Sequence, residues 1–176
     1  MDSKQIRYIC KNDSVLRKFN INIILDSELV GIAPNSIYFL LVKPKAQRKK
    51  KGGPLFFRGH WCLLESLDKE EVHFFDPSGM PPNSCYISKA AKMYCKQYNA
   101  KFYVNKIVYQ LLGTSICGLI CVFVALCRSR GMNYKKIKTE KLNHSLKFIT
   151  QVLPDFFYYF LPKNNRIVPR FSYDFL

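Results

Sequence analysis

Cys117 and His60 are the two residues of this chain whose types and settings could form a nucleophile and its base. Cys117 follows the turn Gly113-Thr114-Ser115 and begins an apolar run that predicts the first turn of a buried helix. Free backbone N–H groups and the helix dipole stabilise a thiolate at such a position. Cys117 is therefore a candidate nucleophile.

His60 is the best placed of the chain's three histidines to act as the base. It follows Gly59 and begins a predicted strand, and functional sites often form where a loop meets the end of a strand. His73 instead lies inside a strand, and His144 lies in an amphipathic helix. Asp76 ends the neighbouring strand of the same predicted hairpin. A carboxylate there could reach the His60 ring and fix its tautomer.

Two other interpretations of the Cys117 region stay open on these residues alone. The stretch from Ile107 to Cys127 has no charged residue and could cross a membrane, but polar residues and glycines interrupt it, so we expect a core helix and no membrane span. A buried structural role is the other interpretation for any of seven cysteines. Cys121, one helical turn after Cys117, fits the core better than a metal site, and no metal site is predicted.

The chain is strongly basic, with 28 Lys and Arg against 12 Asp and Glu and a net charge of +16. Such a charge predicts a polyanionic partner, although a lysine-rich codon usage would also produce it. Arg128, Arg130, Lys135, Lys136 and Lys138 add to the charge. The predicted DNA-binding residues lie in a basic loop just before His60, a run that an import signal would also explain: Lys43, Lys45, Arg48, Lys49, Lys50 and Lys51.

Residues 1–176 are predicted to form a single domain. The cysteines are odd in number and no secretory signal precedes them, so we expect free thiols in a reducing compartment.

A helix is expected to begin at Ser88 as its N-cap. The other predicted elements are one or two short helices in 3–19, strands at 36–43, 60–67, 71–75 and 101–109, the helix from Cys117, and an amphipathic helix at 139–153.

The order of four short motifs is more specific than any one of them. His60-Trp61 is followed by Asp76-Pro77, and Gln110 stands seven residues before Cys117 in the run Cys117-Gly118-Leu119-Ile120-Cys121. This order resembles the adenain family of adenovirus endopeptidases, within the clan of cysteine peptidases that includes the SUMO and ubiquitin-like deconjugating enzymes. The resemblance covers about Gly52 to Cys127. Two departures are Asp76, where adenain has glutamate, and Ile116, where the deconjugating relatives have aspartate.

The resemblance implies an α+β fold with a mixed central sheet flanked by helices and the nucleophile at the N-terminus of a buried helix. It implies that Cys117 attacks, His60 transfers protons, Asp76 orients His60 and Gln110 stabilises the oxyanion. The expected function is a viral cysteine endopeptidase that cleaves capsid and core precursor proteins during virion maturation. The alternatives are a ubiquitin-like or SUMO deconjugating protease and a non-enzymatic basic nucleic-acid-binding virion protein.

The same resemblance implies the partners. No cofactor is required for the chemistry, viral DNA is an expected activator, and the expected location is the virion and the host-cell nucleus or viral factory. Adenain-like enzymes are also activated by a disulfide-linked peptide. Here Asn99 stands at the corresponding distance and Cys95 only near it, so a peptide activator is compatible with the chain but its covalent attachment is not predicted. A monomer is expected.

Replacing Gln110 provides the first test of these roles. Gln110→Ala is expected to lower kcat for peptide cleavage by roughly 10²–10³, because it removes one oxyanion donor. Cys117→Ala is expected to abolish cleavage, and a Gln110→Ala enzyme with unchanged kcat would remove Gln110 from the mechanism. Steady-state kinetics on a peptide substrate measures both.

Overall fold

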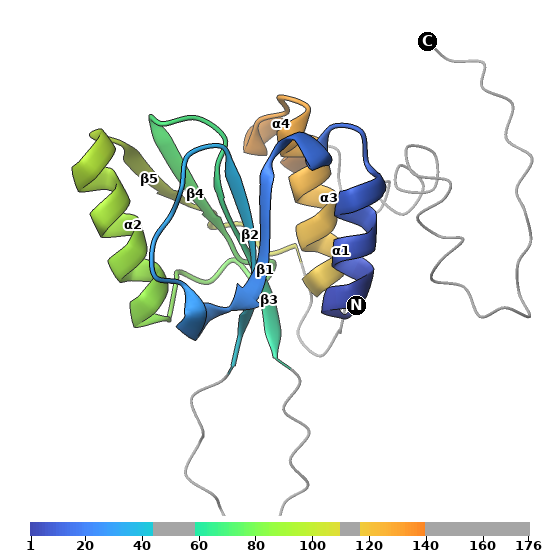
Figure 1. The fold of residues 1–176 in the computed structure, drawn as a ribbon, viewed down its shortest axis with the longest axis horizontal. Helices are drawn as coiled ribbons and strands as arrows, with labels where there is room; N and C mark the ends of the chain where they lie inside the picture. The colour runs from blue at the N-terminus through green and yellow to red at the C-terminus, as the bar shows by residue number, and fades with distance from the viewer. Residues whose placement is uncertain (44–58, 110–116, 140–176) are drawn as a thin grey trace, which may run out of the picture. The chain divides into compact units, whose positions relative to one another are not determined.

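The computed structural model describes residues 1–43, 59–109 and 117–139, which contain a five-stranded mixed sheet (Figure 1). The strands lie side by side in chain order, with parallel pairs β1–β2 and β4–β5 at the edges and antiparallel pairs β2–β3 and β3–β4 in the middle. Their bounds are β1 Asn20–Leu25, β2 Ser36–Val42, β3 His60–Ser66, β4 Glu71–Phe75 and β5 Lys101–Val104. The predicted α+β class with a mixed central sheet is confirmed.

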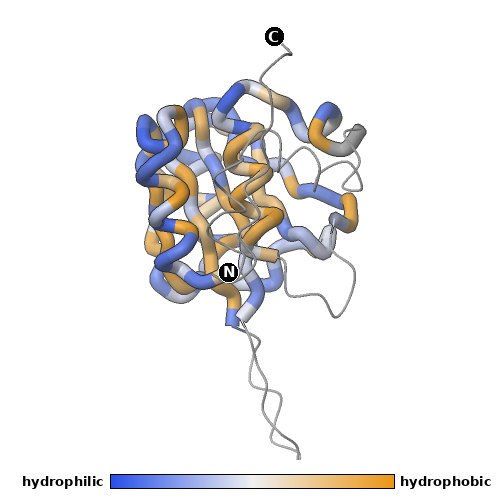
Figure 2. Tube along the Cα trace, turned by 90° about the vertical axis from the view of Figure 1, so that its right-hand side faces the viewer, coloured by the Kyte–Doolittle hydropathy of each residue, from blue (hydrophilic) through white to orange (hydrophobic). Residues whose placement is uncertain are grey.

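The helices cover both faces of this sheet (Figure 1). Helix α2, Cys85–Tyr98, lies on one face, and helices α1, Ser3–Asn12, and α3, Cys117–Ser129, lie on the other. Short 3₁₀ turns η1, Leu16–Lys18, and η2, Asp26–Glu28, flank β1, and helix α4 spans Tyr134–Thr139. Hydrophobic positions concentrate in the interior of these elements (Figure 2). Burial of that apolar surface is what holds the two helical layers to the sheet.

Sequence periodicity located the central strands well and the edge strands poorly. Strands β2 and β3 are almost wholly buried, so they appear as continuous apolar runs. Strand β1 is half-buried and contains two asparagines, which hid its strand character. Strand β5 ends at Val104 instead of Tyr109, because Asn105 turns its side chain to the backbone of the neighbouring segment.

The predicted start of α2 at Ser88 is wrong. The helix begins at Cys85 with Ser84 as its N-cap, and the Ser88 N–H already donates to the Ser84 carbonyl at 3.2 Å inside the first turn. Ser84 makes no side-chain capping bond, so the local capping signal pointed to the wrong serine. The predicted helix at 139–153 lies outside the described residues apart from Thr139, the last residue of α4.

Helix α3 is apolar almost throughout and packs on β3. Gly118 allows the close approach, because a Cβ atom there would lie 3.0 Å from Trp61 Cδ1 and 3.1 Å from Met1 Cβ. None of the helices in the described ranges is long and apolar enough to cross a membrane. The interpretation of α3 as a core helix accounts for the absence of charged residues from Cys117 to Cys127.

A buried ion pair joins the far end of α3 to β3. The guanidinium of Arg128 donates to the carboxylate of Glu65, which is fully buried, and the Tyr134 hydroxyl donates to the same carboxylate oxygen at 3.1 Å. Arg130 pairs with Asp13 at 2.6 Å. Arg128 is thus engaged within the fold, whereas the Arg130 side chain is 34% exposed and its contribution to a polyanion surface stays a prediction.

Arg128→Ala is expected to lower the free energy of unfolding by about 3–5 kcal/mol, because it leaves the Glu65 carboxylate buried without a cation. Chemical denaturation followed by circular dichroism measures the change. Arg130→Ala is the matched control, since its partly exposed pair should contribute at most about 1 kcal/mol. Equal losses in the two variants would contradict the structural role assigned to the Arg128–Glu65 pair.

Candidate active site

The hairpin of β3 and β4 brings His60 and Asp76 together, as the sequence predicted. His60 begins β3, and Asp76 follows the last residue of β4 on the antiparallel neighbour. The His60 Nε2 atom lies 2.7 Å from Asp76 Oδ1. Asp76 is 7% exposed, whereas the His60 side chain is 31% exposed, so the carboxylate contacts the ring from its buried side.

The carboxylate of Asp76 is held by further donors. The Ser78 backbone N–H donates to Asp76 Oδ1 at 2.7 Å, and the buried Cys62 thiol is also hydrogen-bonded to the Asp76 side chain. Cys62 is two residues after His60 on β3, so both side chains project toward the same face of the sheet. These contacts fix the carboxylate in the position from which it orients His60.

Cys117 completes the arrangement at the first residue of α3. Its sulfur lies near the His60 ring and the backbone N–H groups of Trp61 and Gly118, and these groups lower the pKa of the thiol. Burial raises the pKa of the Cys117 thiol, but the bond to His60, these backbone donors and the His60 charge outweigh burial, so the pKa lies below 9.0. Because Asp76 occupies Nε2, Nδ1 is the ring nitrogen left to face the sulfur.

The pKa of His60 is raised from 6.5 to about 9. The hydrogen bond to Asp76 is the largest cause and the bond to Cys117 the next, while burial acts in the opposite direction. At neutral pH His60 is therefore an imidazolium beside a sulfur whose pKa is depressed. Both shifts favour the charged forms of the pair, which are the reactive forms of a cysteine nucleophile and its histidine partner.

Asn105 is a site residue that sequence reasoning missed. Its Oδ1 accepts the Asp76 backbone N–H at 2.7 Å, and its Nδ2 donates to the Asp76 carbonyl at 2.9 Å and to the Ile107 carbonyl at 3.0 Å. The Tyr109 N–H donates to the Pro77 carbonyl at 2.8 Å. The segment after β5 is thereby tied to the turn that carries Asp76. An asparagine in an apparent strand gave no sign of this role.

Trp61, expected beside the histidine, is buried against Gly118 and donates its indole N–H to the Met1 carbonyl at 3.1 Å. Cys121 donates its thiol to the Trp61 carbonyl at 3.4 Å. Burial raises the pKa of the Cys121 thiol well above 9.0, so the core role expected for this cysteine agrees with its surroundings.

Several predicted site residues lie outside the described residues. Gln110 is one, and so are five of the six residues of the predicted DNA-binding loop: Lys45, Arg48, Lys49, Lys50 and Lys51. Lys43, the sixth, is exposed just after β2. Asn99 adopts a left-handed conformation with φ 53° at the end of α2, and Cys95 is a partly buried free thiol.

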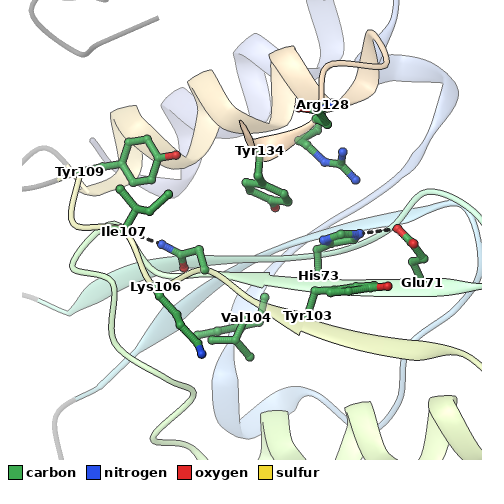
Figure 3. A pocket seen from close by; sticks show the side chains of 12 residues that line it. Glu71, His73, Tyr103, Val104, Lys106, Ile107, Tyr109, Arg128 and Tyr134 are labelled. Carbon is green, nitrogen blue, oxygen red and sulfur yellow. Dashed lines mark hydrogen bonds and ion pairs between the residues drawn. The ribbon is translucent and has the colours of Figure 1, made fainter. Parts of the chain in front are cut away.

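A pocket of about 450 Å³ lies along β5 (Figure 3). Its wall includes His73, whose ring stacks on Tyr103 with centroids 4.9 Å apart and lies 5.3 Å from the Tyr134 ring. Glu71 accepts a hydrogen bond from His73 at 2.8 Å. His73, which the sequence placed inside a strand, lies in β4. Asn105 lines the pocket, but Cys117, His60 and Asp76 do not.

Comparison with known proteins gives similarities in structure but none in sequence. No protein-family model matches the chain, and no curated protein matches it in sequence. The ASFV pS273R protease matches with a TM-score of 0.41 and 12% identity, over 56% of this chain and 36% of that one. ChlaDub1 from Chlamydia trachomatis matches with a TM-score of 0.39 and 16% identity, over 91% and 80%. The chain thus spans about a third of the length of the pS273R protease.

The fall of activity at alkaline pH is expected to depend on the hydrogen bond between His60 and Asp76. The rate should fall as pH rises through about 9, because His60 loses its proton there, and Asp76→Asn should move that limb to lower pH because the anionic acceptor is gone. The acid limb belongs to Cys117 ionisation and lies below pH 9. Profiles of kcat/KM on a peptide measure both limbs.

Asn105→Ala provides a graded comparison in the same measurement. It should shift the alkaline limb in the same direction by a smaller amount, since Asp76 stays charged but loses its backbone support. An alkaline limb that stays in place in Asp76→Asn would show that Asp76 does not set the state of His60.

Proposed function

We propose that this chain is a cysteine endopeptidase. The observation that carries the proposal is the continuous chain of contacts from Cys117, at the start of α3, through His60 to Asp76. Each residue has the environment its role requires: a depressed thiol pKa, a protonated histidine at neutral pH and a buried carboxylate that fixes the ring. Three such matches in one place favour catalysis over a structural cysteine.

In the proposed reaction, the Cys117 thiolate attacks the carbonyl carbon of the scissile peptide bond. The His60 imidazolium then donates its Nδ1 proton to the leaving amine, which departs and leaves an acyl-enzyme. Neutral His60 next takes a proton from water, whose oxygen attacks the thioester and releases the new carboxyl terminus. The Cys117 backbone N–H and Gln110, by its resemblance to adenain, would stabilise the oxyanion of each tetrahedral intermediate.

The proposed substrates are capsid and core precursor proteins of a virus, cleaved during virion maturation. The spacing of Gln110 from Cys117 and the Cys117-Gly118-Leu119-Ile120-Cys121 run support the maturation enzymes, whereas Ile116 departs from the deconjugating relatives. The net charge of +16 supports viral DNA as a partner that concentrates the enzyme near such substrates.

A peptide electrophile that captures active thiolates tests the enzymatic proposal. We expect a peptide vinyl sulfone to label Cys117 rapidly at neutral pH, and Cys117→Ser to abolish that labelling. Cys121→Ser is the matched control: it removes a thiol one turn further along α3 and should leave labelling intact. Exposed Cys85 provides an internal comparison when the modified residues are mapped by mass spectrometry.

Labelling of Cys85 and Cys117 at the same rate would contradict the proposal and favour a basic binding protein without catalytic activity. If Cys117 is selectively labelled, cleavage of a capsid precursor is then compared with cleavage of a ubiquitin-like fusion. Preference for the fusion would replace virion maturation with deconjugation as the function of the same residues.

A further inference from the structure

Three potential metal ligands meet behind the proposed catalytic histidine. A ring nitrogen of His60, the sulfur of Cys62 and a carboxylate oxygen of Asp76 all lie within 4.8 Å of one another. Among the described residues this is the one group of three or more histidine, cysteine or acidic side chains arranged closely enough to hold an ion. The mechanism proposed above uses His60 and Asp76 but not Cys62.

The donor set has the chemistry of a zinc site. Zn²⁺ binds one nitrogen, one sulfur and one oxygen readily, at about 2.0–2.3 Å from each, which places neighbouring donors of a tetrahedral site about 3.5 Å apart. The widest pair of donors here therefore needs to approach by at most about 1.3 Å. Such movement is within the reach of side-chain torsions, because His60 lies at a strand end and is partly exposed.

We propose that Zn²⁺ binds reversibly to His60, Cys62 and Asp76 and thereby blocks the catalytic cycle. The ion would take the place of the proton between His60 Nε2 and Asp76, and Cys62 would bind as a thiolate, with both protons released to solvent. The fourth position stays open to water. Access is from the exposed side of the His60 ring, since Cys62 and Asp76 are buried.

The inhibitory consequence rests on the proposed peptidase function. Asp76 could no longer stabilise the imidazolium that forms during the reaction, because its carboxylate and Nε2 would both be bound to the metal. Cys117 is not a member of this donor set and would not be a ligand of this ion. This geometry distinguishes the proposed site from a metal bound between the nucleophile and His60.

Co²⁺ titration tests the site without relying on activity, because a cobalt–thiolate bond gives a charge-transfer band in the near ultraviolet. With the full chain we expect such a band at one equivalent of Co²⁺, and its loss on addition of Zn²⁺. Cys62→Ser should remove the band, and Asp76→Asn should weaken Co²⁺ binding by at least about tenfold. Cys117→Ser and Cys121→Ser should retain it, since neither thiol belongs to the donor set.

A band that disappears in Cys117→Ser but survives in Cys62→Ser would place the metal at the nucleophile and overturn the proposal, as would the absence of any band with millimolar Co²⁺. If Cys62→Ser fails to fold by circular dichroism, His60→Ala provides the decisive variant, since its partly exposed ring can be removed with less effect on the core. Co²⁺ binding in a chain that does not label at Cys117 would sustain the site and reject only the peptidase function.

Discussion

The hydrogen bond between His60 and Asp76 is the interaction on which the rest of the site depends. It raises the pKa of the imidazole, and the charged imidazole in turn lowers the pKa of the Cys117 thiol. The bond exists only because two antiparallel strands place a strand start beside a strand end. Everything else near it, from the Ser78 N–H to the side chain of Asn105, limits the freedom of the carboxylate. The pairing of these strands thus sets up the contacts that lower the pKa of the Cys117 thiol.

The local signal of the flanking apolar runs placed two candidate residues correctly in the fold: Cys117 begins a buried helix and His60 begins a strand. Their roles as nucleophile and base came from the order of the four motifs and its resemblance to adenain, and these roles stay predictions. The supporting residues have no such signal. Asn105 acts through backbone groups 29 residues away in the chain, and Cys62 looks like any core cysteine until its distance from Asp76 is known. Long-range contacts of this kind depend on how the strands pair, which periodicity does not specify.

Part of the positive charge of the chain serves the fold, since Arg128 neutralises a buried carboxylate and Arg130 pairs with Asp13. Lys43, in contrast, is exposed just after β2. Counting basic residues therefore overestimates the surface that a polyanion would meet, and only residues without an internal acceptor should enter a prediction of nucleic-acid binding.

The attachment of α3 at both of its ends has a mechanical consequence. Near Cys117, the absence of a side chain at Gly118 lets the helix pack closely on Trp61, and about 15 Å further along the axis Arg128 joins it to Glu65. A helix held by one contact can change its tilt, whereas contacts near both ends restrict both its tilt and its movement along its axis. The sulfur lies on a helix and the imidazole on the sheet, so the distance between them stays constant only if the helix keeps its position on the sheet. The ion pair at the distant end of α3 thus helps to fix the position of Cys117 relative to His60, although it contacts neither residue.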